Sequence, residues 1–167
     1  MRQHDAIAGA IAARCELACE VLRAFGSLRF TATGWSMLPA VWSGDTLLVE
    51  RVRPHDFRVG DIALVGREGR ICAHRVVSVP GDSRSSWWIT QGDAISTPDR
   101  PVSENELLGR VTQLVRSGKS KMVSANLSGL QRLFIQIVRR SVLAARIFVY
   151  ITSKLRTQRE PVLLCQG

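Results

Sequence analysis

Residue types that together perform nucleophilic catalysis occur in the middle of this 167-residue chain. Ser36 follows Gly34-Trp35, and glycine at that place lets the chain turn sharply and expose the serine hydroxyl. A serine hydroxyl is a weak nucleophile on its own, so it needs an adjacent base. His74 is the best candidate for that base, because it lies in the strand-like run ICAHRVVSV and can point across a sheet at the serine turn.

The other two histidines are weaker candidates, since His4 is close to the N-terminus and His55 lies in an Arg-Pro-His-Asp turn. A catalytic histidine also needs a carboxylate that orients the imidazole and stabilises its charged form. Asp93 and Asp99 lie in one loop, TQGDAISTPDRPV, directly after a strand-like run. On spacing alone, ordinary turn residues and a hydrogen-bonded core histidine remain the stronger interpretation.

The segment that must position these residues consists of short extended runs separated by turns. Between residues 28 and 115 the runs are LRFTAT, DTLLVERV, DIALVG, RICAHRVVSV, SSWWITQG and LLGRVTQLV. They are rich in Val, Ile, Leu, Thr or Trp, and turns such as Ser-Gly-Asp and Pro-Gly-Asp separate them. The pattern predicts a mainly β domain with a compact antiparallel core. No helix-length segments lie between the runs, which argues against a parallel βαβ sheet.

A helix is predicted before this domain, over residues 5–25, where apolar residues recur at helical spacing. Asp5 can cap its start and Gly26 can end it. We expect this amphipathic helix to cover one side of the core, and docking on a membrane or a partner is the alternative. The chain then divides into the helix at 1–27, the β domain at 28–117 and a tail at 118–167.

The tail carries most of the positive charge of the chain. Residues 1–117 hold fourteen Lys and Arg against thirteen Asp and Glu, whereas residues 118–167 hold nine against one. Apolar residues recur at helical spacing over 127–156 with arginines between them, which predicts a basic amphipathic helix. Such a helix suits an anionic membrane interface, and packing on its own domain or a partner is an equally good interpretation.

The sequence contains no run of roughly 20 apolar residues that would predict a membrane span. Acidic residues near the N-terminus argue against a secretory signal. We therefore expect a peripheral membrane association or a cytoplasmic location. The four cysteines do not form a disulfide framework in a chain of this length, and with three scattered histidines they argue against a zinc site. Neither a metal nor a cofactor is expected.

Six short motifs follow one another in order through the predicted β domain. They are Gly34–Pro39 (Gly-x-Ser-Met-x-Pro), Gly44-Asp45, Gly60–Ile62, His74–Val77, Gly92–Ala94 with Asp99, and Leu108–Val111. This series resembles the S24/S26 peptidase superfamily, which includes the LexA-like self-cleaving repressors and the type I signal peptidases. The resemblance implies a bent, mostly antiparallel β core with a shallow substrate groove.

The resemblance also implies a particular set of catalytic residues. Where bacterial signal peptidases and the repressors hold a lysine base, this chain has His74, and its three lysines all lie beyond residue 118. This is similar to the Ser–His–Asp signal peptidases of the endoplasmic reticulum, archaea and some spore-forming bacteria. By that resemblance Ser36 matches the nucleophile, His74 the general base and Asp99 the triad acid. Asp93 would be a supporting acidic residue of the same loop.

The implied activity is cleavage of a signal or leader segment from a precursor protein or peptide through an acyl-enzyme. Gly34, Trp35 and Met37 surround the nucleophile and are expected to contact this substrate. The chain departs from the family at two of these positions. Many signal peptidases have a serine where this chain has Gly34, and most have a glycine where it has Trp35.

Two functions of other classes are the alternatives. One is a non-catalytic peptide-binding module on the same fold, although such a module need not keep a complete Ser36, His74 and Asp99 set. The other is a nucleic-acid-binding regulator. It ranks last, because no helix-turn-helix pattern precedes the β domain and the basic tail lacks interleaved aromatic residues. No nucleic acid is expected as a partner.

Overall fold

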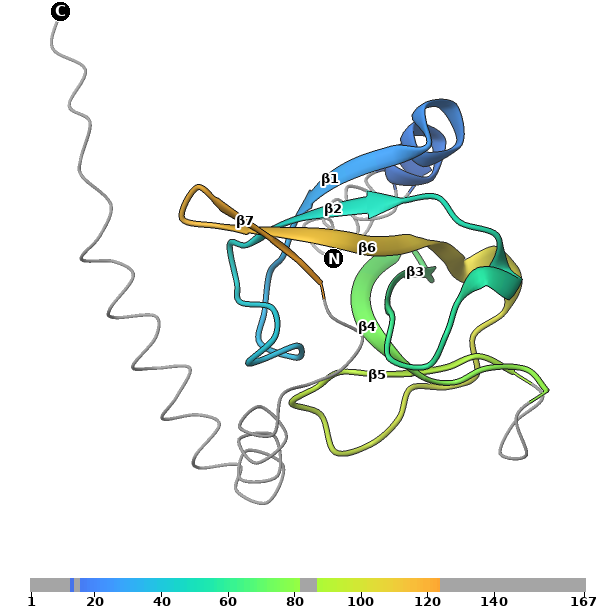
Figure 1. Ribbon diagram of the computed structural model, residues 1–167. Coiled ribbons are helices and arrows are strands. Elements are labelled where there is room, and N and C mark those ends of the chain that lie inside the picture. The colour runs from blue at the N-terminus through green and yellow to red at the C-terminus, as the bar shows by residue number, and fades with distance from the viewer. Residues whose placement is uncertain (1–12, 14–15, 82–86, 124–167) are drawn as a thin grey trace, which may run out of the picture.

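The computed structural model describes residues 13, 16–81 and 87–123. The predicted basic helix over 127–156 lies outside this range, as does most of the first half of the predicted N-terminal helix. The described residues form a strongly curved antiparallel sheet with one helix packed against the sheet (Figure 1). The prediction of a mainly β domain is confirmed.

The sheet contains seven strands in the order β1-β2-β6-β3-β4-β5, with β7 paired to β6 beside this path. The strands are β1 (Ser27–Thr31), β2 (Thr46–Glu50), β3 (Ile62–Arg67), β4 (Arg70–Ser78), β5 (Ile89–Gln91), β6 (Leu107–Arg116) and β7 (Lys119–Met122). Two short 3-10 helices, η1 (Pro54–Asp56) and η2 (Glu104–Glu106), lie in the connections. Each predicted extended run overlaps one of the first six strands to within one residue at the strand ends that it misses.

Irregularities in the strand register allow the sheet to bend. The register shifts between Leu48 and Val49 where β2 pairs with β6, and between Leu64 and Val65 where β3 pairs with β6. Such bulges increase the local twist of a sheet. Gly109 of β6 lies at this crossing, where a Cβ atom would come within 2.7 Å of the Glu50 carbonyl oxygen. The bend therefore requires a residue without a side chain at this position.

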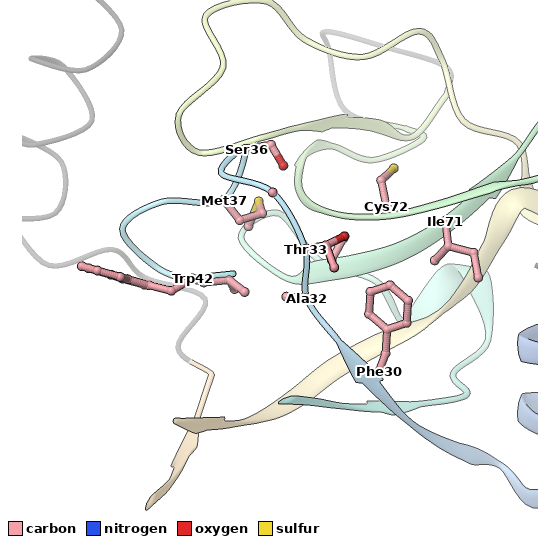
Figure 2. Close-up of a pocket in the computed structure, with 11 residues that line it drawn as sticks. Phe30, Ala32, Thr33, Ser36, Met37, Trp42, Ile71 and Cys72 are labelled. Atoms are coloured by element: carbon pink, nitrogen blue, oxygen red, sulfur yellow. The ribbon is translucent and has the colours of Figure 1, made fainter. Parts of the chain in front are cut away.

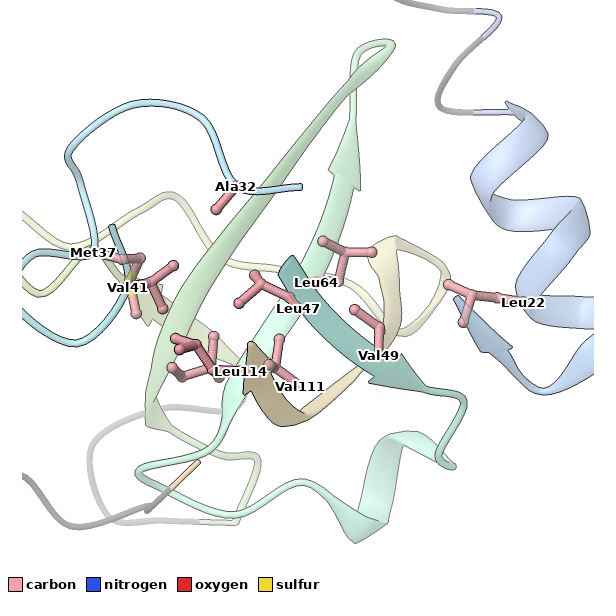
Figure 3. Packing of buried hydrophobic residues seen from close by; sticks show 10 residues of the cluster. Leu22, Ala32, Met37, Val41, Leu47, Val49, Leu64, Val111 and Leu114 are labelled. Atoms are coloured by element: carbon pink, nitrogen blue, oxygen red, sulfur yellow. The ribbon is translucent and has the colours of Figure 1, made fainter. Parts of the chain in front are cut away.

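β3 is buried on both of its faces, and this divides the core into two clusters. Its residues alternate, so that Ile62 and Leu64 face one cluster while Ala63 and Val65 face the other. The first cluster is also formed by Leu22, Ala32, Met37, Val41, Leu47, Val49, Val111 and Leu114 (Figure 3). The second is also formed by Phe57, Val76, Trp88, Val102 and Leu107. The sheet thus has a hydrophobic layer on each side.

The described part of the N-terminal helix, residues 16–25, contributes Leu22 to the first cluster, and its Ala18 is also buried. Figure 3 shows Leu22 at the edge of that cluster. Phe25, which the helical pattern placed on the apolar stripe, is instead 78% exposed. Gly26 ends the helix as predicted, with a φ of 70° and its N–H donating to the Leu22 carbonyl at 3.1 Å.

The sheet extends beyond the predicted boundary at residue 117. Ser117 and Gly118 both have positive φ values and turn the chain back into β7, which pairs with the end of β6. β7 has the sequence Lys-Ser-Lys-Met, and all four of its residues are exposed, so no apolar alternation predicts it from the sequence. In the described residues, no helix is long and apolar enough to cross a membrane.

An ion pair holds η2 against the end of β3. The Arg67 guanidinium contacts both carboxylate oxygens of Glu106, with Nη2 at 2.9 Å from Oε2 and Nε on Oε1. The same carboxylate accepts hydrogen bonds from the N–H and the hydroxyl of Ser103, at 2.7 and 2.8 Å. The Arg67 hydrogen bond, helped by Ser103, lowers the pKa of Glu106 from 4.5 to about 2.

This pair predicts a specific loss of stability in acid. Because the pKa of Glu106 is lower in the folded chain, its contribution is complete above about pH 4.5 and is lost as the pH falls toward 2. Glu106→Gln should lower the free energy of unfolding at pH 7 and reduce its decline below pH 4.5, measured by urea titrations across this range. Glu104→Gln, at an exposed position of the same η2, is the control. An unchanged acid slope in Glu106→Gln would contradict the assignment.

Candidate active site

The serine loop, residues 32–45, connects β1 to β2 and carries Ser36. Hydrogen bonds close its base, where the Ala32 N–H donates to Asp45 at 2.8 Å and the Gly44 N–H donates back to Ala32 at 2.7 Å. Gly34 has a φ of 87°, a conformation that glycine adopts without strain. Beyond the serine, Met37 and Val41 are buried in the first cluster. The hydrogen bonds close the base of the loop, and the buried side chains fix its middle. Ser36 is therefore held at one position.

A buried carboxylate holds the far end of this loop. Asp45 is fully buried and accepts hydrogen bonds from the Trp42 N–H at 2.7 Å and from Arg116 Nη2 at 2.6 Å and Nε at 3.0 Å. The Arg116 guanidinium also lies over the Trp42 ring, 5.2 Å from its centroid. This arrangement ties the serine loop to the end of β6.

His74 lies in β4 and faces the serine loop, as predicted from the sequence. Its Nε2 is 3.1 Å from the Ser36 hydroxyl oxygen, and its Nδ1 is 2.6 Å from Oδ2 of Asp99. The imidazole is mostly buried, with 12% of the side chain exposed. The structure therefore brings Ser36, His74 and Asp99 into one continuous hydrogen-bonded chain.

The acid loop, residues 92–101, follows β5 and carries Asp99. Its end is fixed to β5, because the Asp99 N–H donates to the Thr90 carbonyl and the Val102 N–H to the Trp88 carbonyl, each at 2.8 Å. The Thr90 hydroxyl also donates to Oδ2 of Asp99 at 2.7 Å. Thr90 therefore holds both the backbone and the side chain of Asp99.

The charge of Asp99 decides how the protons of the site are arranged. Burial of the carboxyl opposes ionisation, but hydrogen bonds from His74 and Thr90 outweigh it and lower the pKa of Asp99. An ionised carboxylate only accepts hydrogen bonds, so Nδ1 of His74 must carry the proton. Nε2 then has a free lone pair and accepts the hydrogen bond of the Ser36 hydroxyl. This is the arrangement in which histidine acts as a general base.

Asp93 lies in a different environment from Asp99, although both belong to the acid loop. It pairs with Arg75, whose Nε and Nη2 each lie 2.8 Å from one of its oxygens. Arg75 Nη1 also donates to the Gly60 carbonyl at 2.7 Å. Only 8% of the arginine and 4% of the aspartate side chain is exposed. Asp93 therefore supports the site through the residue that follows His74, rather than through the imidazole itself.

The serine loop and the acid loop are in direct contact. The Ala94 N–H donates to the Ser36 carbonyl at 2.8 Å. A Cβ atom on Gly92 would come within 2.7 Å of that same carbonyl oxygen and 2.8 Å of Ile95. Glycine at position 92 is therefore what allows the acid loop to approach the backbone of Ser36.

A small cavity of about 80 Å³ opens beside Ser36, between the start of the serine loop and β4 (Figure 2). Of the residues predicted to contact substrate, Gly34 and Met37 line it, whereas Trp35 does not and is 44% exposed. The remaining lining residues are Phe30, Ala32, Thr33, Ser36, Val41, Trp42, Ile71, Cys72 and Ala73. An apolar cavity of roughly 150 Å³ holds a benzene ring, so this one suits a small aliphatic side chain.

Cys72 is a second potential nucleophile at the wall of this cavity, but its chemistry argues against that role. Partial burial of the thiol, together with the negative charge of Asp99, raises the pKa of Cys72 to about 11. A thiol is nucleophilic as the thiolate, and this one is protonated at neutral pH. Ser36 is therefore the nucleophile that the geometry favours.

Several residues of the site were not predicted from the sequence. Thr90, Arg67 and Arg116 each contact a loop that carries a triad residue, yet lie in separate strands. In the sequence, these three residues stand out only because each is a polar residue inside, or at the end of, an apolar run. Arg75 had a stronger signal, because it directly follows His74 and is an arginine in the middle of a predicted strand.

No family model, curated protein or solved structure matched this chain. Among the residues that the structure describes, no three His, Cys, Asp or Glu side chains are grouped so that they could hold a metal ion.

The Arg75–Asp93 pair gives a prediction for stability. Arg75→Met leaves a buried carboxylate without its partner, which typically costs about 3–5 kcal/mol. Replacing both residues, as in Arg75→Met/Asp93→Leu, should cost less than the sum of the single changes, measured by urea unfolding followed by tryptophan fluorescence. Arg53→Ala, which removes the exposed pair with Asp56, is the control and should cost less than about 1 kcal/mol. Additive single effects would show that the two buried charges do not depend on each other.

Proposed function

We propose that this chain is a serine endopeptidase of the signal-peptidase type, which cleaves a signal or leader segment from a precursor protein or peptide. The observation that carries the proposal is the continuous chain from the Ser36 hydroxyl through His74 to Asp99, at 3.1 and 2.6 Å. The order of motifs that resembles the S24/S26 superfamily supports it, since Ser36, His74 and Asp99 are the residues it assigned to catalysis. The curved antiparallel sheet agrees with the fold that this resemblance implies.

The proposed reaction is acyl transfer. His74 accepts the Ser36 proton through Nε2 as the hydroxyl oxygen attacks a peptide carbonyl, and Asp99 stabilises the imidazolium that forms. The imidazolium then protonates the leaving amine, and a water molecule, deprotonated by His74, hydrolyses the acyl-enzyme. The Ser36 N–H is our candidate donor to the developing oxyanion. It donates to no backbone carbonyl in the described part of the chain.

An unpaired section of β4 supports binding of an extended peptide. β5 pairs with β4 only from Arg75 onward, whereas β3 pairs with the other edge of β4 from Arg70 to Arg75. In the described sheet, the edge from Ile71 to His74 that faces away from β3 therefore has no strand beside it. A peptide added there as a strand would make main-chain hydrogen bonds next to Ser36. The cavity beside Ser36 would receive a small side chain of that peptide.

The peripheral membrane contact through residues 127–156 stays part of the proposal. These residues lie outside the described part of the chain. Their basic amphipathic pattern suits the inner, anionic surface of a membrane, where a leader peptide made in the cytoplasm would be available.

The catalytic assignment is tested by peptide cleavage. The intact chain should cleave a peptide that contains a small-x-small site, and Ser36→Ala, His74→Ala and Asp99→Asn should each lower kcat by roughly 10³–10⁴-fold. Ser27→Ala and His55→Ala are matched controls, because both residues are exposed and lie outside the two loops and the strand that carry the triad, and they should retain full activity. Products are identified by mass spectrometry.

If the wild-type chain cleaves no faster than Ser36→Ala across a broad peptide library, the peptidase proposal is wrong. Peptides that are then bound but not cleaved would favour the alternative, a peptide-binding module on the same fold.

Substrate selection is tested at the residue that enters the cavity. Peptides with Ala or Gly before the cleaved bond should be hydrolysed about 10–200-fold faster, in kcat/KM, than peptides with Leu or Phe, because the larger side chains exceed the space. Ile71→Ala enlarges the cavity and should raise the rate for Leu. Ile89→Ala, in β5 and outside the lining, is the control. Equal rates for Ala and Phe would show that this cavity does not select the substrate.

A further inference from the structure

The end of β3 makes a set of contacts with the acid loop that the catalytic chain does not include. Arg67 Nη2 donates to the Pro101 carbonyl and Nη1 to the Arg100 carbonyl, the latter at 3.4 Å. The same guanidinium pairs with Glu106 in η2, just beyond the loop. One side chain therefore contacts the two residues that follow Asp99 and the helix that ends this connection.

We propose that Arg67 is a positioning residue for the triad, which holds Asp99 at the distance from His74 that keeps the imidazole in its active tautomer. This proposal rests on the peptidase function proposed above. The acid loop is fixed to β5 on one side by the Asp99 and Val102 N–H groups. Arg67 fixes the same stretch on the other side through its carbonyl groups, so the segment is held from both edges.

The burial of this contact makes it effective. Arg67 and Glu106 have 22% and 24% of their side chains exposed, so the guanidinium is partly withdrawn from water. Charge-assisted hydrogen bonds in such surroundings are stronger than exposed ones. An arginine presents its donors in a rigid planar fork, and here the fork reaches a carboxylate and two carbonyl groups at once. Lysine would keep the charge but could not make all of these contacts.

Arg67 also acts on Asp99 through its charge. Its positive charge is one of the influences that lower the pKa of Asp99, after the hydrogen bonds from His74 and Thr90. Removal of the guanidinium should therefore let Asp99 protonate at a higher pH.

The chain offers a closely matched control. Arg100 lies in the same loop, directly after Asp99, and its side chain pairs with Glu68 at 2.8 Å. Both partners are about 70% exposed, with side-chain values of 72% and 70%. An exposed pair of this kind contributes little to stability. Arg100→Ala removes an arginine and an ion pair from the acid loop without touching the contacts of Arg67.

The test compares Arg67→Ala, Arg67→Lys and Arg100→Ala in the full-length chain. Arg67→Ala should lower kcat by about 10–100-fold, since a displacement of about 1 Å in a catalytic group has effects of that size. Its KM should stay within about threefold, because Arg67 contacts the acid loop and not the cavity beside Ser36. Arg67→Lys should lose a smaller part of kcat, because lysine keeps the charge but not all of the contacts, and Arg100→Ala should match the wild type.

A second readout does not depend on activity. The proton on His74 Nδ1 should give a downfield NMR signal in the wild type and in Arg100→Ala, and this signal should broaden or disappear in Arg67→Ala. If the wild-type chain cleaves no peptide, the peptidase function fails, while this signal still decides whether Arg67 positions Asp99. A folded Arg67→Ala variant with unchanged kcat and an unchanged His74 signal would overturn the proposal.

Stability must be followed in the same experiments. If Arg67→Ala does not fold at the assay temperature, Arg67→Lys and Glu106→Gln replace it, because each keeps the size of the side chain while weakening the pair. Under the proposal both lower kcat and weaken the His74 signal at temperatures well below their unfolding midpoint. Wild-type values for both variants would overturn it.

Discussion

The buried ion pair between Arg75 and Asp93 is the constraint on which the site depends. Two charges that are almost fully withdrawn from water are tolerated only when they satisfy each other, and here two hydrogen bonds of 2.8 Å do so. Arg75 is the neighbour of His74 in β4, and Asp93 opens the loop that ends at Asp99. The pair therefore holds the acid loop against β4, the strand that carries His74.

Two further arginine–carboxylate pairs hold the ends of the serine loop and the acid loop in the same way. Arg116 binds Asp45 and holds the end of the serine loop, and Arg67 binds Glu106 and holds the end of the acid loop. The two loops are anchored in different hydrophobic layers, because Met37 packs in the first cluster and Val102 in the second. β3 and β4 lie between these layers, so His74 is placed where the two loops meet.

Much of the fold follows from local patterns. Alternating apolar residues and turn glycines predicted six strands, and Gly26 ends the helix because glycine adopts a positive φ without strain. β7 was missed, since its four residues are exposed and carry no apolar alternation. Phe25, an apolar residue of the predicted helix, is 78% exposed, because helical periodicity marks an apolar face without showing whether the domain covers it.

The sequence by itself determined which residue types are available for catalysis: a serine in a glycine turn, one histidine inside a strand, and no lysine before residue 119. It left two aspartates in one loop, and only the resemblance to a peptidase family preferred Asp99. The tertiary structure decided between them. Arg75 binds Asp93 in the interior, whereas Thr90 and His74 bind Asp99. The spacing of residues along the chain cannot show which aspartate contacts His74. The partners of the two carboxylates come from other strands and meet them only when the sheet bends.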